Sequence, residues 1–367
     1  MSLPVCVCIP VYNGGPTIRR TLSNLLQQEH KDFQILVYDD GSTDRTAEFV
    51  EEIAGRDSRV RLVRGETNMG RGGARNRLLQ LAGDSLVAWQ DADDLWHSTK
   101  LSEQLKAREA LRDSLADDRF VLISTYSTHK ITRSGPKVKK HTPPEDYGIP
   151  YFLGANYREC PFQLQAVIGP AATFMSAGGF DNNLNWAEDV DICFKILRGG
   201  FKIVGHPTEQ PLAIYNHNLA KARGAVVEAA HAVLVARYRE FAAEQGFDIE
   251  KVFMRRAANY VAKIYMEHGR FDRALALNLR LLSSLGADEP EQFNQISRMI
   301  LSIAHESTAR FLAANAVAQQ SENAGENGPA APGLVRPLGG GGRPQRRRMG
   351  RPAPISKDAA EGSSAKG

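Results

Sequence analysis

Short apolar runs recur through the first quarter of the chain, separated by segments with a helical pattern. The runs occupy residues 5–9, 33–38, 60–63 and 86–89. Nearly continuous apolar strands of this kind are typical of a parallel sheet that is covered on both faces. After the first run, Ile18, Leu22 and Leu25 are spaced so that they share one face of a helix. Strands and helices that alternate in this way predict a doubly wound α/β sheet.

The middle of the chain has a looser pattern of predicted elements. They are a helix at 99–112, a strand at 120–127, a short strand at 171–175, a helix at 185–197 and a strand at 201–204. Between them, residues 130–150 are basic and rich in proline, which predicts either the tip of a hairpin or a mobile loop. The α/β pattern therefore continues beyond residue 120 with less regular connections.

From about Val226 onward the pattern consists of long amphipathic helices without strands. Residues 259–282 predict a helix, a tight turn at Gly269 and a second helix, a unit that resembles a tetratricopeptide-type hairpin. The alternative is an accessory helical bundle packed on the preceding domain. The end of the chain is rich in Gly, Pro, Ser and Arg, a composition typical of disorder. We therefore expect an α/β domain at 1–222, a helical region at 223–317 and a disordered basic tail at 318–367.

The composition is that of an ordinary soluble globular protein, with 42% hydrophobic and 24% charged residues. No apolar run approaches the roughly 20 residues that a membrane-spanning helix needs, and the first residues carry no secretory signal pattern. The four cysteines show no spacing typical of a metal site or a disulfide framework. These features favour a reduced, cytoplasmic location.

The net charge of +4 lies in the predicted tail. Residues 317–367 hold eight lysines or arginines and four acids, so the rest of the chain is formally neutral. A nucleic-acid-binding domain usually carries a basic patch and a net positive charge. We therefore expect no nucleic acid partner.

Three carboxylates follow the fourth apolar run, at Asp91, Asp93 and Asp94. In an open α/β sheet, ligands bind beyond the carboxyl ends of the strands. Carboxylates gathered there repel one another unless a cation joins them. Hard oxygen ligands suit Mg²⁺ or Mn²⁺ that is shared with the phosphates of a substrate. The alternative is a solvated acidic turn, since two aspartates this close together are common.

Five short motifs occur in order along the α/β part of the chain. They are Ile9-Pro10-Val11-Tyr12-Asn13, Asp39-Asp40-Gly41-Ser42-Thr43-Asp44, Asn68-x-Gly70-x-x-x-Ala74-Arg75-Asn76, Asp91-Ala92-Asp93-Asp94, and Gly178-Gly179-Phe180-Asp181 with Trp186-Ala187-Glu188-Asp189 after it. Together they resemble a family 2 glycosyltransferase with the GT-A fold of nucleotide-diphospho-sugar transferases, over about residues 3–217. Each motif is unspecific alone, and their order and spacing carry the resemblance. It implies a GT-A type doubly wound mixed sheet, followed here by the helical region and the tail.

The resemblance also assigns a metal site. Asp93 is implied as a direct ligand of Mn²⁺ or Mg²⁺, Asp91 as a neighbour of the ribose or the metal, and Asp94 as a supporting residue. His217, which follows a late strand, is implied as a further metal ligand. The alternative for His217 is a structural role, the usual one for a single histidine.

The donor nucleotide is expected at the ends of the first two strands. Asp40 is implied as an acceptor of hydrogen bonds from the nucleoside base, which Pro10, Tyr12 and Asn13 frame. Tyr12 either stacks on the base or caps the sheet. Arg75, at the start of a helix, is expected to reach the diphosphate, unless it is one of many surface arginines.

The acceptor is expected near the last motif. By the resemblance, Asp189 is the general base that takes the proton of the acceptor hydroxyl, and Glu188 orients the acceptor. Trp186 and Asp191 are placed on the acceptor side, with Asp191 as the fallback base. The family usually has arginine where Lys195 stands here, and a lysine cannot make the same bidentate contact.

The implied function is metal-dependent, inverting transfer of a sugar from a nucleotide-diphosphate donor, most commonly a UDP-sugar, to a hydroxyl of a glycan or lipid-linked acceptor in cell-surface polysaccharide or glycoconjugate synthesis. Such an acceptor implies peripheral contact with the inner face of a membrane, and apolar faces on the C-terminal helices would allow an oligomer. One alternative is a sugar nucleotidyltransferase, although the loop at 13–17 lacks the basic residue that such enzymes carry there. The other is a non-catalytic nucleotide-sugar-binding or scaffold protein.

Overall fold

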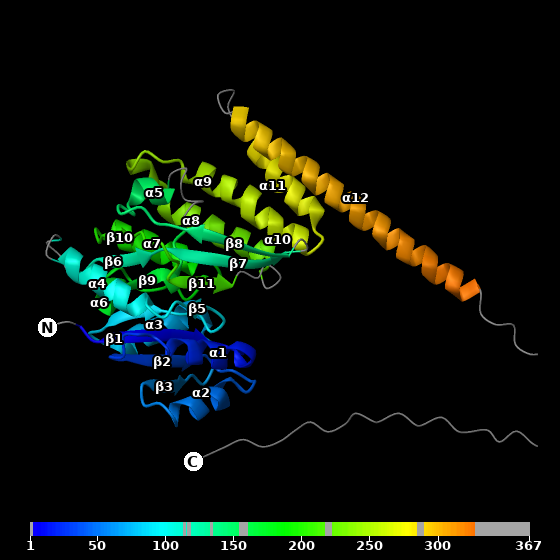
Figure 1. The fold of residues 1–367 in the computed structure, drawn as a ribbon. Coiled ribbons are helices and arrows are strands. Elements are labelled where there is room, and N and C mark those ends of the chain that lie inside the picture. Colours follow the sequence, from blue (N-terminus) through cyan, green and yellow to red (C-terminus); the bar gives the residue numbers. More distant parts are fainter. Residues whose placement is uncertain are drawn as a thin grey trace, which may run out of the picture. The chain divides into compact units, whose positions relative to one another are not determined.

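The structure is a computed structural model. It describes residues 3–112, 115, 119–132, 135–153, 161–216, 222–284 and 290–326. The chain forms two compact units, Met1–Leu312 and Ala313–Gly367. Both sheets, and helices on both faces of the larger one, belong to the first unit (Figure 1).

Among the described residues the central sheet has seven strands, in the order β10-β6-β9-β4-β1-β2-β3. Their bounds are β1 (Val5–Val11), β2 (Phe33–Asp39), β3 (Val60–Arg64), β4 (Leu86–Trp89), β6 (Val121–Ser124), β9 (Val167–Pro170) and β10 (Ile203–His206). β1 pairs in parallel with β2 and β4, so Val5 lies opposite both Phe33 and Leu86. β9 runs antiparallel to β4 and β6, which makes the sheet mixed. The predicted strands of the N-terminal part are confirmed as β1 to β4.

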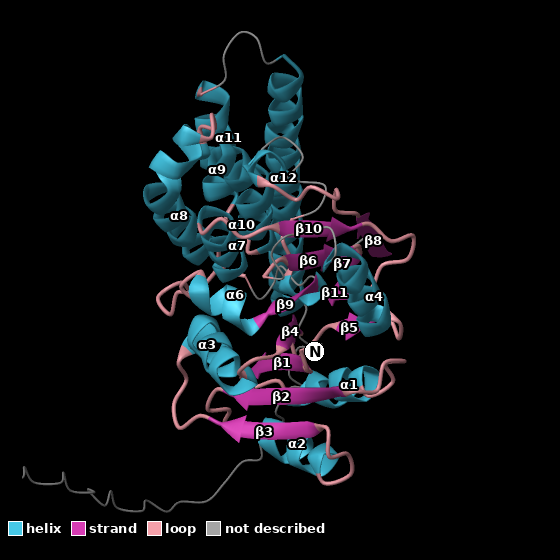
Figure 2. Ribbon diagram, turned by 90° about the vertical axis from the view of Figure 1, so that its left-hand side faces the viewer, coloured by secondary structure: helices cyan, strands magenta, loops and turns pink. Residues whose placement is uncertain are grey.

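Helices cover both faces of this sheet. They are α1 (Gly15–Leu25), α2 (Thr46–Ala54), α3 (Gly70–Ala82), α4 (Lys100–Arg112), α6 (Ala171–Ser176) and α7 (Glu188–Arg198). Figure 2 shows α1 and α4 on one side of the sheet and α3 and α6 on the other. The strands between them are therefore buried, and Val7, Ile35 and Val87 are fully inaccessible to solvent. Burial on both faces is the reason that these strands read as continuous apolar runs.

A second, smaller sheet has the order β5-β11-β7-β8. Its strands are β5 (Leu95–Trp96), β7 (Tyr126–Thr132), β8 (Gly135–His141) and β11 (Ala213–Asn216). The single strand predicted at 120–127 is wrong, because the chain leaves the central sheet after Ser124 and enters the second sheet at Tyr126. Within the basic segment, the hairpin is confirmed as β7 and β8, and α5 (Ile149–Leu153) follows.

Two further predictions near the site need correction. The strand predicted at 171–175 is the helix α6, and the strand lies just before it, as β9. Short apolar runs do not distinguish a buried strand from a buried helix, and Pro170 joins the two here. The helix predicted from residue 185 begins at Glu188, because Ala187 has a left-handed backbone with φ 62° that an α-helix cannot contain.

The C-terminal helices are α8 (Gly224–Glu244), α9 (Ile249–Arg256), the π-helix η4 (Ala257–Val261), α10 (Ala262–Glu267), α11 (Phe271–Ser283) and α12 (Pro290–Glu326). The turn predicted at Gly269 is confirmed, with φ 71° between α10 and α11. Tyr238 of α8 stacks on Phe194 of α7 with ring centroids 4.2 Å apart, and both belong to the main core. The accessory bundle packed on the α/β domain is therefore the better description of this region.

Most of the segment expected as a tail lies outside the described residues. Helix α12 passes residue 318 and ends at Glu326, and residues 327–367 lie outside the described part of the chain. Among the described residues, no helix is long and apolar enough to cross a membrane.

Candidate active site

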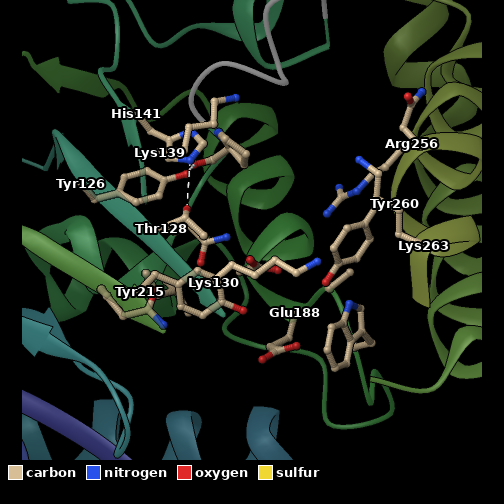
Figure 3. Close-up of a pocket in the computed structure, with 18 of the residues that line it drawn as sticks. Tyr126, Thr128, Lys130, Lys139, His141, Glu188, Tyr215, Arg256, Tyr260 and Lys263 are labelled. Atoms are coloured by element: carbon tan, nitrogen blue, oxygen red, sulfur yellow. Dashed lines mark hydrogen bonds between the residues drawn. The ribbon is translucent and has the colours of Figure 1, made fainter. Parts of the chain in front are cut away.

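A cavity of about 1160 Å³ opens beyond the carboxyl end of β4. We call five of its lining residues the floor: Arg75, Asp91, Asp93, Glu188 and Asp189. One wall, the hairpin wall, is formed by β7 and β8, and the other, the helix wall, by α9, η4 and α10. Figure 3 shows the hairpin side chains on the left, those of the helix wall on the right and Glu188 below them.

Arg75 joins two of the motifs at the floor. It is 4% exposed, and its Nη1 donates to Glu188 Oε1 at 2.6 Å while its Nη2 donates to Asp91 Oδ1 at 3.0 Å. The second oxygen of Asp91 accepts a hydrogen bond of 2.6 Å from Gln165 Nε2. Arg75 is therefore a buried ion-pair partner, which excludes the alternative of an ordinary surface arginine.

The two acids at the start of α7 have opposite electrostatic environments. Burial acts to raise the pKa of Glu188, but the charges of Arg75 and Arg71 outweigh it and leave the pKa lowered. Burial and the neighbouring charge of Glu188 raise the pKa of Asp189 to about 6, against the opposing charge of Arg256. A carboxyl group with this pKa is ionised at neutral pH and still basic enough to take a proton, which suits a general base.

The backbone before these acids is strained. Ala187 has φ 62°, a conformation that costs a residue with a side chain on the order of 1 kcal/mol. It allows α7 to begin at Glu188, so both acids lie in the first turn of the helix and line the cavity. The positive end of the helix dipole stabilises their negative charge.

The acidic loop after β4 separates its members. Asp93 lines the cavity, whereas Asp94 is fully buried and its Oδ1 accepts the N–H of Asn216 at 2.7 Å. Burial, followed by the charges of Asp91 and Asp93, raises the pKa of Asp94 well above its usual range. The loop thus concentrates negative charge that a divalent cation would neutralise.

The described residues of the site supply only part of the ligands that a metal ion needs. No group of three or more His, Cys, Asp or Glu side chains in the described part of the chain is arranged to hold one. Mg²⁺, however, commonly takes one or two carboxylates from the protein and the rest of its ligands from substrate phosphates and water. Asp93 and Asp91 fit that pattern, and the predicted ligand His217 lies outside the described residues.

The residues expected at the nucleoside lie at the ends of β1 and β2 and are not among the described residues that line the cavity. Asp40 is 3% exposed, and its two oxygens accept the N–H groups of Met69 and Gly70, each at 2.9 Å. Burial raises its pKa, and these two hydrogen bonds oppose the rise. Because Gly70 begins α3, Asp40 fixes the start of the helix that carries Arg75.

Asn13 and Tyr12 differ in what they contact. Asn13 has φ 51°, and its Oδ1 accepts the N–H of Thr43 at 2.9 Å, so it joins the first two motifs. Tyr12, next to it, is 51% exposed. Its ring is therefore accessible to a ligand, whereas Asn13 holds the loop that presents it, and Pro10 is part of β1.

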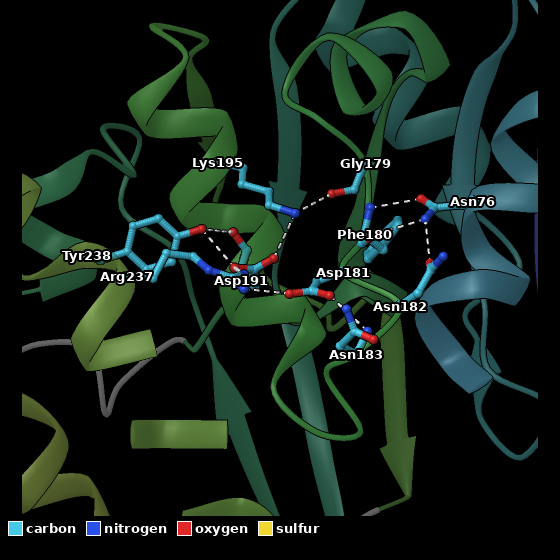
Figure 4. A network of polar contacts seen from close by, with 10 residues as sticks. All are labelled: Asn76, Gly179, Phe180, Asp181, Asn182, Asn183, Asp191, Lys195, Arg237 and Tyr238. Carbon is cyan, nitrogen blue, oxygen red and sulfur yellow. Dashed lines mark hydrogen bonds and ion pairs between the residues drawn. The ribbon is translucent and has the colours of Figure 1, made fainter. Parts of the chain in front are cut away.

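Asp191 is not among the described residues that line the cavity, and Figure 4 shows it between Lys195, Arg237 and Tyr238. It is fully buried, and its carboxylate binds Arg237 Nη1 at 2.6 Å, Tyr238 Oη at 2.7 Å and Lys195 Nζ at 3.0 Å. Lys195 also donates to the carbonyl of Gly179 at 2.8 Å. Asp191 and Lys195 thus connect α7 to α8 and to the motif at Gly178–Asp181. Because its carboxylate is engaged there, we do not retain Asp191 as a candidate base.

The third and fifth motifs are held together by Asn76. Its Oδ1 accepts the N–H of Phe180 and its Nδ2 donates to the carbonyl of the same residue, both at 2.8 Å (Figure 4). Gly179 has φ 65° there, and a side chain on it would approach Asn76 Oδ1 to 2.7 Å. These contacts place α3, with Arg75, beside the segment that carries Glu188.

Among the remaining residues that line the cavity, one was predicted and others were not. Trp186 was expected and lines the cavity, with the guanidinium of Arg71 5.2 Å from its ring. Gln165, Arg256 and Tyr260 were missed. Tyr260 lies in the π-helix, a form often found at functional sites, but no residue pattern in the sequence signals it.

Comparison with known proteins shows the family of the chain. The family model for glycosyl transferase family 2 matches residues 6–175. The amylovoran biosynthesis glycosyltransferase AmsB of Erwinia amylovora is 33% identical over 215 residues, which are 57% of this chain and 68% of that protein. The chain belongs to glycosyl transferase family 2.

Two other matches cover different shares of their proteins. The UDP-Glc:alpha-D-GlcNAc-diphosphoundecaprenol beta-1,3-glucosyltransferase WfaP of Escherichia coli is 30% identical over 134 residues, 36% of this chain and 53% of that protein. The crystal structure of S. aureus TarS 1-349 has a TM-score of 0.51 at 19% identity, covering 85% of this chain and 92% of that one. The predicted GT-A type α/β fold with a helical C-terminal region is confirmed.

Proposed function

We propose that this protein transfers a sugar from a nucleotide-diphosphate donor, a UDP-sugar in the first instance, to a hydroxyl of a glycan or lipid-linked acceptor, with inversion at the anomeric carbon. The observation that carries the proposal is the floor of the cavity. There Asp189, with a pKa of about 6, stands beside Glu188, which Arg75 connects to Asp91.

In the proposed reaction, each residue of the floor has a separate role. The acceptor oxygen attacks the anomeric carbon while the bond from that carbon to the diphosphate oxygen breaks, and its electron pair leaves with the nucleoside diphosphate. The proton of the acceptor hydroxyl passes to the carboxylate of Asp189. A single displacement of this kind, with the base opposite the leaving group, inverts the configuration. Arg75 keeps Glu188 ionised and in place beside Asp189.

Mn²⁺ or Mg²⁺ would be held by Asp93 and Asp91 together with the donor phosphates, and when bound it would neutralise charge on the leaving diphosphate. Tyr12 is proposed to lie against the nucleoside base, because its ring is exposed where β1 ends. Asp40 supports the same end of the site through α3.

The relatives support the class of substrates. AmsB is named for amylovoran biosynthesis, and WfaP for transfer from UDP-Glc to a sugar on diphosphoundecaprenol. A donor of the UDP-sugar type and an acceptor in polysaccharide or lipid-linked glycan synthesis are therefore the first to test for this chain.

The test is release of nucleoside diphosphate from UDP-, GDP- and dTDP-sugars, with Mn²⁺, with Mg²⁺ and with excess chelator. We expect release from one donor class, lost in chelator and in Asp93→Ala. Asp189→Asn should keep donor binding, measured by calorimetry, and lose turnover. Absence of any binding of a nucleotide sugar or nucleoside diphosphate, with or without metal, would overturn the proposal.

A further inference from the structure

The two walls of the cavity, unlike its floor, carry an excess of positive charge. On the cavity-facing side of the hairpin wall, Lys130 of β7 and Lys137 and Lys139 of β8 line the cavity. They alternate with residues of the opposite side, such as Lys140, because successive side chains of a strand point to opposite faces.

Two of these lysines oppose each other directly. Lys130 and Lys137 are cross-strand partners in the β7–β8 register. Like charges at such positions destabilise a hairpin. Lys130 is partly buried, and this burial lowers its pKa; Glu267 on α10 opposes that change and Lys137 adds to it. The arrangement costs folding free energy, which a bound anion would offset.

The helix wall presents a second set of cations across the cavity. Lys251 and Arg255 of α9, Arg256 beside them and Lys263 of α10 line it. In Figure 3, Lys130 extends from the hairpin wall into the space between the walls, and Arg256 and Lys263 lie on the other side. Several of these side chains also make contacts within the protein. The relevant quantity is therefore the balance of charge.

That balance is strongly positive. Among the described lining residues of the two walls there are seven lysines and arginines and one acid, Asp248. Asp248 caps α9, where its side chain accepts the N–H of Lys251 at 3.1 Å. The remaining acids of the lining belong to the floor.

We propose that the two walls bind a phosphate or diphosphate group carried by the acceptor, so that the acceptor is a phosphorylated sugar whose hydroxyl is delivered to Asp189. Lysine and arginine together suit phosphate, lysine as a point charge and arginine through paired N–H groups. The partly buried ring of Trp186 and the ring of Tyr260, on the helix wall, also line the cavity, and aromatic rings of this kind suit a sugar face. This inference rests on the proposed function and adds the chemical class of the acceptor.

The test uses inorganic pyrophosphate as the probe, titrated by calorimetry into the full chain with Mg²⁺ in excess and the donor site filled with UDP. The native protein should bind pyrophosphate in addition to UDP. Lys137→Ala and Lys251→Ala should each weaken that binding about tenfold, since each removes one charged partner, without changing UDP affinity. The matched control is Lys140→Ala, on the opposite face of β8, which should change neither.

The outcomes separate the two proposals. Displacement of pyrophosphate by UDP, or equal pyrophosphate affinity in the native protein and both wall variants, would overturn the inference. Failure of UDP to bind would count against the proposed function instead, and titration of the UDP-free protein would still compare the wall variants. Lys137→Ala should not lower the melting temperature, because it removes the like-charge pair, so weaker binding would not reflect unfolding.

A second pair of probes distinguishes the sources of the phosphate. A short alkyl diphosphate represents a lipid-linked sugar, and a glycerol phosphodiester oligomer represents a phosphodiester polymer. Tighter binding of one, sensitive to Lys137→Ala, assigns that source. Binding of neither would contradict the proposal.

Discussion

The floor and the walls of the cavity come from different kinds of sequence. The floor residues belong to motifs that follow the carboxyl end of β4, lie in the first half of α3 or begin α7, and the order and spacing of these motifs along the chain are distinctive. The walls come from β7–β8 and from α9 to α10, where the sequence is merely basic or helical. The comparison indicates that a few fixed groups supply the chemistry, while acceptor recognition depends on segments without a transferable pattern.

The strongest test of this division is Asp189→Asn. The asparagine is similar in shape but cannot take the acceptor proton, so we expect turnover to fall about 10²- to 10⁴-fold. UDP affinity, measured by calorimetry, should stay within about twofold, because no step of binding needs the proton. Turnover close to that of the native protein would remove Asp189 from the role of base.

Arg75→Met tests whether the floor is held together by its ion pairs. It leaves buried Glu188 with Arg71, 3.9 Å away, as its cationic partner among the described residues. The free energy of unfolding in urea should fall by about 3–5 kcal/mol, the usual effect of breaking a buried pair. The control Arg77→Met, on the exposed side of α3, should change it by less than about 0.5 kcal/mol. Adding Glu188→Gln to Arg75→Met should recover part of the loss, and no recovery would contradict the buried-pair explanation.

The pH dependence of turnover should follow the ionisation of Asp189 in the floor and not that of the lysines in the walls. Asp189 has a raised pKa of about 6, and only its ionised form acts as a base. The value of kcat/KM should therefore rise about tenfold per pH unit up to pH 6 and level off above it. The residual activity of Asp189→Asn should lack this rise, and the same profile in both proteins would assign the rise to another group.

Asp191→Asn tests whether Asp191, unlike Asp189 on the same helix, has a structural and not a catalytic role. Asp191 binds Lys195, Arg237 and Tyr238 away from the cavity. We expect the free energy of unfolding to fall by about 1–3 kcal/mol, because three donors lose a charged acceptor. Turnover at a temperature where the variant stays folded should remain within about threefold of native. A loss comparable to that of Asp189→Asn would restore Asp191 as a candidate base.

The smallest effect is expected at Tyr12, outside the cavity. Because its side chain is half-exposed, Tyr12→Ala should leave the free energy of unfolding within about 0.5 kcal/mol. Loss of ring stacking on the nucleoside should weaken UDP binding by about 1 kcal/mol, roughly fivefold. Unchanged UDP affinity would support the alternative in which the ring only caps the sheet.

Much of the fold and of the floor could be predicted from the sequence. Nearly continuous apolar runs predicted β1 to β4, since burial on both faces leaves few polar positions in such strands, Gln34 of β2 and Arg61 of the edge strand β3 being among them. The resemblance placed Arg75, Asp91, Asp93, Glu188 and Asp189 in one site, and all five line the same cavity. The predictions of strands at 120–127 and 171–175 failed because short apolar runs do not report which sheet, or which type of element, buries them.

The sequence by itself determined the family, the doubly wound sheet and the set of acids and the arginine at the floor, because these depend on local spacing and on strand ends. Only the tertiary structure decided which acids face the cavity. Asp189 and Asp191 are two residues apart, and the left-handed Ala187 together with the packing of α8 directs one into the cavity and the other into a buried ion pair. The structure also brought α9 to α10 opposite the β7–β8 hairpin. Contacts between segments so far apart in the chain arise from packing of whole elements, which leaves no pattern in the residues that meet.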